Sequence, residues 1–223
     1  MALGSCGGAD IIDGNLHLLS RGAWSGVLKL DTATAPTGKV TVSFQGGLSL
    51  SGYVFAGGVA YDVVHVQVVG GAGGLTKTLR PAAYQNAQLR DPLAAIMSQS
   101  GESQSSTIDA TVLAVQLPYW TIVASTTARA LDELCGAAAS ALGKAITWRV
   151  LGDGTIWLGS ETWPSKSMPN GSDLLDAFPA GGRFVIGADT PWLLPGVALS
   201  GVGNVGAVDH FFDSHEVRSW AWV

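Results

Sequence analysis

Charged side chains are scarce in this chain of 223 residues. Asp, Glu, Lys and Arg make up 13% of the residues, about half of the usual share, whereas hydrophobic residues make up 47%. A free monomer normally relies on surface charge to stay soluble. A chain with so little charge has either an unusually large core or a surface that other subunits cover. The abundance of small residues, including 30 glycines, favours the second alternative.

Basic clusters, long apolar runs and closely spaced cysteines are also missing. The net charge of −5, without any cluster of Lys or Arg, argues against nucleic acid or an anionic membrane as a partner. No run approaches the roughly 18 apolar residues that cross a bilayer. Residues 1–10 have neither the basic region nor the apolar core of a secretory signal, so we expect synthesis in a reducing cytoplasm. Cys6 and Cys135 lack metal-type spacing, and Cys135 is expected to be a buried thiol.

Motifs of known enzyme chemistry are absent or incomplete. The glycines at 201–206 match the dinucleotide-binding pattern as text, but the residues after them have strand character, whereas the motif requires a helix. The pairs Asp209–His210 and His215–Glu216 lack a third metal ligand of comparable quality. There is no nucleophile elbow or phosphate loop, and the carboxylates show no glycosidase spacing. We therefore expect no enzyme activity, no metal and no cofactor.

The first third of the chain has the pattern of a small β-barrel or sandwich. Short segments rich in β-branched and aromatic residues alternate with turn sequences of Gly, Pro, Thr and Asp. The expected strands contain Leu16 and Leu18, then residues 24–30, 40–44, 48–55 and 62–69. A run of glycines at 70–74 interrupts the pattern.

The middle of the chain predicts helices and one hairpin. From Thr127 to Leu142, apolar residues recur at three- and four-residue steps, hydroxyl groups at 125–127 can cap the start, and Gly143 can end the helix. Residues 147–151 and 155–158 then flank a short glycine loop, which indicates a hairpin. A second helix is expected to start with Asp91 as cap and to end at Gly101. Residues 108–120 fit either strand or helix.

The last 40 residues return to short strands, at 183–186, 197–200, 205–212 and 216–223. Segments near Pro36 and Pro195 show a weak similarity that suggests two related barrels. The predicted fold class is mainly β with an α+β middle: two small β-barrel-like domains with an inserted helix and β-hairpin unit. The expected domains are 1–80, an N-terminal barrel; 81–163, an α+β region; and 164–223, strands of a second barrel.

Eight tryptophans suggest either packing or sugar binding. A sugar platform needs exposed rings backed by polar side chains, whereas Trp220 and Trp222 are two residues apart and share one strand face. Core or subunit-interface packing is therefore the favoured use. Because they lie on terminal strands, Trp24, Trp220 and Trp222 are our candidate interface residues.

Several short motifs together resemble tail baseplate hub proteins of bacteriophages. They occur in the same order and span most of the chain: residues 21–24, 69–75, 90–93, 101–102, 117–120, 130–135, 148–150, 153–155, 161–163, 194–196 and 208–210. The resemblance implies a homotrimer in which each subunit supplies two small barrels. Such a ring matches a sixfold tail tube to a threefold central spike. This chain is shorter than many hubs, which implies that peripheral domains are absent or carried by a neighbouring protein.

The resemblance therefore implies a structural virion protein with no catalytic role. Its expected partners are two further copies of itself, the tail tube or distal tail protein, the central spike and neighbouring baseplate proteins. Apolar surface buried between subunits would supply the affinity. One alternative is a carbohydrate-binding tail-tip module, for which sugars would quench tryptophan fluorescence. Another is a peptidoglycan hydrolase, for which a cleared zone on cell walls would depend on His210.

Overall fold

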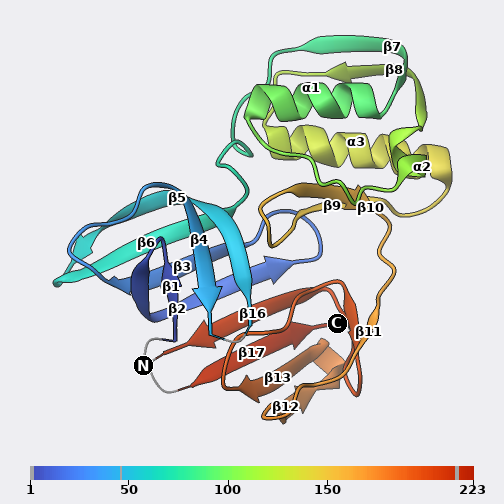
Figure 1. Ribbon diagram of the computed structural model, residues 1–223. Helices are drawn as coiled ribbons and strands as arrows, with labels where there is room; N and C mark the ends of the chain where they lie inside the picture. The colour runs from blue at the N-terminus through green and yellow to red at the C-terminus, as the bar shows by residue number, and fades with distance from the viewer. Residues whose placement is uncertain (1–2, 46, 214–215) are drawn as a thin grey trace. The chain divides into compact units, whose positions relative to one another are not determined.

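The computed structural model describes residues 3–45, 47–213 and 216–223, which form two compact units. Unit 1 comprises residues 1–70 and 162–223, and unit 2 comprises residues 71–161. Over the described residues the fold is mainly β, with helices only in unit 2 apart from one 3-10 turn, which confirms the predicted class (Figure 1). Over the part of the chain that is described, no helix is both long and apolar enough to cross a membrane.

Six strands of unit 1 close into a barrel. They are β1 (Gly4–Cys6), β2 (Ala9–Leu19), β3 (Ser25–Asp31), β4 (Gly38–Phe44), β5 (Ser49–Ala60) and β6 (Val63–Gly70). Their order is β1-β4-β5-β6-β3-β2, and pairing of β1 with β2 completes the circle. Alternate residues point inward, so the core consists of Val, Leu and Phe side chains, for example Leu28, Val42 and Val66. The expected strands are confirmed, and β1 is an addition to them.

The C-terminal strands extend this sheet beyond β2. They follow in the order β16 (Ala207–Phe212), β17 (Val217–Trp222), β13 (Arg183–Ala188) and β12 (Asp173–Phe178), all antiparallel. Segments 1–80 and 164–223 thus share one ten-stranded sheet through the β2–β16 pair. A 3-10 turn, η1 (Pro179–Gly181), joins β12 to β13, and β11 (Ser165–Lys166), β14 (Val197–Leu199) and β15 (Gly203–Val205) form a separate small sheet.

Unit 2 packs two helices against a two-stranded sheet. Its elements are β7 (Ala82–Gln88), α1 (Arg90–Ser100), α2 (Ala110–Leu113), β8 (Gln116–Ile122), α3 (Thr127–Leu142), β9 (Thr147–Val150) and β10 (Ile156–Gly159). The helix that was expected to start with Asp91 as cap begins two residues earlier: Leu89 is the N-cap, and Asp91 accepts a hydrogen bond from the amide of Gln88 at 3.0 Å. The ambiguous segment 108–120 contains a short helix and then a strand.

The helix α3 and the β9–β10 hairpin form as the sequence predicts. Thr126 caps α3 by accepting a hydrogen bond from Arg129, and Gly143 ends it in the left-handed conformation. The indole of Trp148 donates a hydrogen bond to Asp132 of α3 at 3.0 Å, which anchors the hairpin on the helix. Trp157 lies on the opposite face of the hairpin, where Arg149 stacks 4.6 Å from its ring centre.

The turn between β5 and β6 is strained. Tyr61 and Asp62 both have positive φ, 52° and 60°, in a two-residue loop that favours Asn-Gly. Left-handed backbone costs a bulky residue about 1 kcal/mol. The double substitution Tyr61→Asn with Asp62→Gly should therefore raise the free energy of unfolding by about 1 kcal/mol in urea titrations. The neighbouring control Ala60→Gly should lower it; a stabilising effect of that control would contradict the explanation.

Candidate functional site

An aromatic face covers one side of the C-terminal sheet. It consists of Phe178 on β12, Arg183 on β13, Phe211 on β16, and Trp220 and Trp222 on β17. Register places Trp222, Arg183 and Phe178 in one row across three strands, because Arg183 pairs with both of the others. Alternation along β17 buries Val217, Ser219 and Ala221 and turns both tryptophans to the opposite side, as their spacing predicts.

Ring and charge contacts order this face. The Trp220 ring lies 4.9 Å from Phe211 and 6.4 Å from Trp222, and the Arg183 guanidinium lies 5.0 Å from Trp220 and 5.9 Å from Phe178. The indole N–H of Trp222 donates to the Oδ2 atom of Asp209 at 2.7 Å. The other carboxylate oxygen of Asp209 contacts Nδ1 of His17. These contacts fix the arrangement of the rings within the chain.

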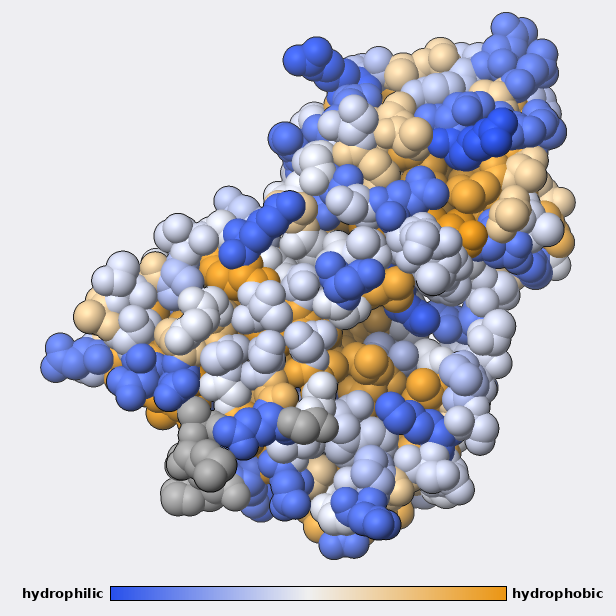
Figure 2. All heavy atoms as spheres, viewed as in Figure 1, coloured by the Kyte–Doolittle hydropathy of each residue, from blue (hydrophilic) through white to orange (hydrophobic). Residues whose placement is uncertain are grey.

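The composition of the aromatic face suits a protein partner. Tryptophan and arginine are enriched among the residues that dominate binding energy at protein interfaces. Asp176 and Asp209 lie in the register row next to that of Arg183, so the face carries charges of both signs. Phe178 is 59% exposed and Phe211 is 39% exposed, which leaves apolar area for contact. Figure 2 shows apolar and weakly polar residues over much of the visible surface between separate charged groups.

Trp24 lies inside the barrel. Its side chain is 3% exposed, and its ring packs against the backbone of Gly52 and Gly70, where an added Cβ would come within 2.8 Å of ring atoms. Two glycines on neighbouring strands thus make room for one indole. Of our three candidate interface residues, Trp220 and Trp222 lie on the aromatic face, whereas Trp24 leaves almost no surface for a partner.

The remaining tryptophans do not form an exposed platform. All eight tryptophans of the chain are buried or half-buried, and none is among the exposed large hydrophobic residues. Trp192 is covered by Lys166, which lies 5.3 Å from its ring centre. A stacking sugar needs an open ring face. The arrangement therefore offers little support for a carbohydrate site.

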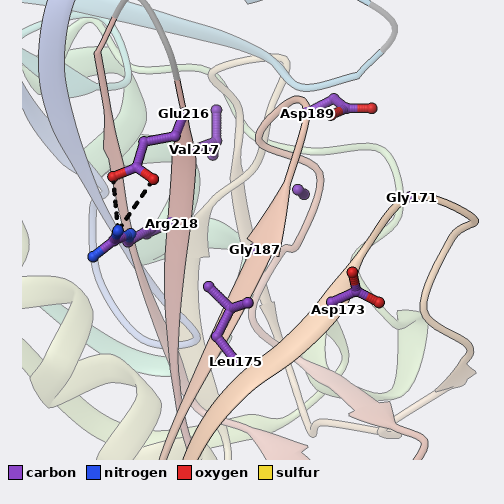
Figure 3. Close-up of a pocket in the computed structure, with 9 residues that line it drawn as sticks. Gly171, Asp173, Leu175, Gly187, Asp189, Glu216, Val217 and Arg218 are labelled. Carbon is purple, nitrogen blue, oxygen red and sulfur yellow. Dashed lines mark hydrogen bonds and ion pairs between the residues drawn. The ribbon is translucent and has the colours of Figure 1, made fainter.

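A pocket of about 310 Å³ lies between β12, β13 and the start of β17. Figure 3 shows its carboxylates on different elements: Glu216 pairs with Arg218, whereas Asp173 and Asp189 lie apart from that pair. Among the described residues, no three His, Cys, Asp or Glu side chains gather as a metal site. His215, the partner that the sequence suggested for His210, lies outside the described residues.

His210 is fully buried, with both ring nitrogens in use. Its Nε2–H donates to the carbonyl of Leu193 at 2.9 Å, so Nδ1 accepts from the Ser219 hydroxyl at 2.7 Å. Burial away from water lowers the pKa of His210 to about 4, against small opposing effects of Leu193 and Asp209. A buried, neutral and fully bonded imidazole is not available to a metal or a substrate.

This imidazole makes the stability of unit 1 depend on pH. The unfolded His210 binds a proton below about pH 6.5, but the folded one does so only near pH 4. The contribution of the neutral His210 to the free energy of unfolding of unit 1 amounts to about 3 kcal/mol. It is complete above pH 6.5 and is lost as the pH drops toward 4. We expect His210→Gln to flatten the dependence of the urea midpoint on pH between 7 and 4.5. Val27→Ala, at an exposed position without a titratable group, serves as the control and should leave the slope intact.

The glycine pattern at 201–206 serves turns. Gly201 and Gly203 have φ of +77° and +125°, and the segment continues into β15 and β16 without a helix. A pyrophosphate therefore has no helix N-terminus to bind. The dinucleotide motif is a textual match only.

Another glycine motif has a structural role in unit 2. The side chain of Glu102 is buried and accepts hydrogen bonds from the amides of Ala72 and Gly74 at 2.8 and 2.6 Å. The run 101–102 thus supplies the carboxylate, and the run 69–75 supplies the loop around it. Gly71 and Gly73 have φ near +90°, which the loop needs.

Sequence reasoning missed the strand β12. Leu174, Leu175 and Phe178 are all exposed there, and each of the strand's six residues is exposed. The sequence signal that could have indicated this strand is a short apolar run between Gly171 and the turn at 179–182. Two aspartates within the run obscured it.

Comparison with solved structures finds tail proteins of the same fold. No family model matches the chain, and no curated protein matches it. A 43 kDa tail protein of prophage MuSo2 from Shewanella oneidensis aligns over 98% of this chain and 95% of its own, with a TM-score of 0.68 and 10% identity. A tail protein from Neisseria meningitidis MC58 aligns over 98% and 95%, with a TM-score of 0.63 and 11% identity.

A third similar structure comes from a secretion system. The E. coli c3393 protein, a type VI secretion component with structural similarity to T4 tail proteins gp27 and gp5, aligns over 96% of this chain and 73% of its own. Its TM-score is 0.62 at 12% identity. At these identities the comparisons show the fold. The resemblance to baseplate hub proteins is thus confirmed as a shared fold over almost the whole chain.

Proposed function

We propose that this chain is a structural protein of a phage tail, and specifically a hub of the baseplate. The observation that carries the proposal is the match over 98% of the chain to a prophage tail protein that is itself covered over 95%. The proposed role is assembly: the aromatic face offers a contact surface, and the described residues include no group of three His, Cys, Asp or Glu side chains that could hold a metal ion.

The hub would act as a homotrimer at the tip of the tail tube. Each subunit would supply two barrel-like parts, from segments 1–80 and 164–223, so that three subunits present six similar positions. That arrangement joins a sixfold tube or distal tail protein to a threefold central spike. The scarcity of charge, 13% of residues, fits a surface that other subunits cover.

The native mass of the purified protein tests this proposal. Three copies of the 22.9 kDa chain give about 69 kDa, which light scattering during size-exclusion chromatography should report. A stable dimer or a monomer at high concentration would count against the hub. Host polysaccharides should leave the tryptophan fluorescence unchanged; quenching would favour the carbohydrate-binding alternative.

A further inference from the structure

The strand β12 is an edge strand of the unit 1 sheet; it has a register shift between Leu174 and Asp176, and the Asp176 carboxylate accepts a hydrogen bond from the amide of Ala177. It pairs with β13 alone, and among the described residues no other strand covers its outer backbone. Leu174, Leu175 and Phe178 are 45%, 56% and 59% exposed. Natural monomers usually protect such an edge, because its free N–H and C=O groups can pair with another strand. We refer to these three side chains and the backbone of 173–178 as the β12 edge.

A second backbone segment without a strand neighbour on one side lies in the barrel, on the hairpin of β5 and β6. The last residue of β5 that pairs with β4 is Val54; Phe55 lies at a register shift, and residues 56–60 pair with β6 only. Phe55, Val59 and Tyr61 are 59%, 61% and 100% exposed. An added Cβ at Gly58 would meet nothing within 4 Å, so the face of the hairpin is open there, whereas one at Gly57 would lie 3.3 Å from Ala35. We call residues 55–61 the ribbon, whose turn end is visible in Figure 1.

A cyclic ring requires two different surfaces on every subunit, one for each neighbour. The ribbon and the β12 edge meet this requirement, since both belong to unit 1 and both combine free backbone with apolar side chains. Each also leaves short backbone segments that can add to a strand of the other.

The sizes of the two surfaces agree with an interface between subunits. Three large side chains that are about half exposed or more offer roughly 300 Å² of apolar area on each surface. A standard interface buries about 800 Å² per partner, of which roughly 450 Å² is apolar. Each surface thus supplies about two thirds of the apolar area that one partner buries in a standard interface. Backbone pairing between the strands would add polar contacts.

We propose that the ribbon of one copy of this chain adds to the β12 edge of the next copy, so that three such contacts close the ring. The inference rests on the proposed trimeric hub and assigns its subunit interface. The aromatic face continues from Phe178 along the row to Trp222, and it is the surface next to this contact.

Two charge variants test the pairing. Val59→Asp disrupts the ribbon and Leu175→Asp disrupts the β12 edge, while Val27→Asp, a 49% exposed site on β3, is the matched control. Alone, each of the first two should be monomeric by light scattering, and the control should stay trimeric. An equal mixture of Val59→Asp and Leu175→Asp should form a dimer, because one intact ribbon still meets one intact edge. A mixture that stays monomeric, or a trimer of either variant, overturns the inference.

A thiol crosslink provides a second measurement that does not depend on disrupting contacts. The double variant Val59→Cys with Leu175→Cys, treated with a short bis-maleimide, should give a covalent trimer on a denaturing gel. Each single variant should stay monomeric on the gel, because Cys6 and Cys135 are buried. If the double variant is a trimer in solution but the bis-maleimide gives no covalent trimer, this interface is refuted and the proposed hub function still stands. A monomeric wild-type protein refutes both.

Discussion

Replacing Trp24 by alanine is expected to lower the free energy of unfolding of unit 1 by about 3–5 kcal/mol. The indole is 3% exposed and fills the space that Gly52 and Gly70 leave open, so its removal creates a cavity that the barrel cannot easily close. The Nε1–H of Trp24 is buried and has no hydrogen-bond partner. Trp24→Phe keeps most of the ring and removes that unpaired donor, so its loss should be smaller, about 1–2 kcal/mol.

Urea unfolding followed by circular dichroism measures both effects. Gly70→Ala is the reciprocal variant, because its new methyl group would lie 2.6 Å from the indole. Val27→Ala, at an exposed position of the same barrel, is the control and should change stability by less than about 0.5 kcal/mol. A stable Trp24→Ala protein with an altered oligomeric state would instead favour Trp24 as an interface residue.

The second large effect is expected at Glu102. Glu102→Ala leaves the amides of Ala72 and Gly74 without an acceptor in a buried loop, which should cost unit 2 about 3 kcal/mol. Glu102→Gln keeps one acceptor oxygen and should cost less. Hydrogen exchange measures the change locally: both amides should exchange faster in the alanine variant.

Glu133→Ala is the matched control for this substitution. Glu133 forms an exposed pair with Arg129 one helical turn away, a contact worth about 0.3–0.5 kcal/mol. The substitution Glu133→Ala should therefore leave the hydrogen-exchange rates of the Ala72 and Gly74 amides unchanged. Equal effects of Glu102→Ala and Glu133→Ala would mean that the buried carboxylate does not hold the glycine loop.

Local signals predicted the elements of this fold well. The helix 127–142 appeared as expected because capping by Thr126, the apolar face and Gly143 all agree. The barrel strands appeared because their alternation matches a buried inner face. The sequence did not indicate that β2 pairs with β16, since nothing local records a contact between residues almost 200 positions apart.

The interface candidates show the same division between local and distant information. The shared face of Trp220 and Trp222 followed from their spacing of two residues. The burial of Trp24 did not, because it depends on Gly52 and Gly70 from two other strands. The β12 edge was missed because Asp173 and Asp176 mask its apolar residues, and its exposure is set by the absence of a neighbour rather than by its own composition.

The pairing of β2 with β16 also has a consequence for how the chain is made. The six barrel strands all lie within residues 4–70, so the barrel contains every strand it needs before unit 2 is synthesised. The sheet that carries the aromatic face needs β16 and β17, which are translated after unit 2. Domains generally fold as units during synthesis. If the units fold in the order of their synthesis, the late strands add to an existing barrel, and the sheet with the aromatic face is the last part of unit 1 to be completed.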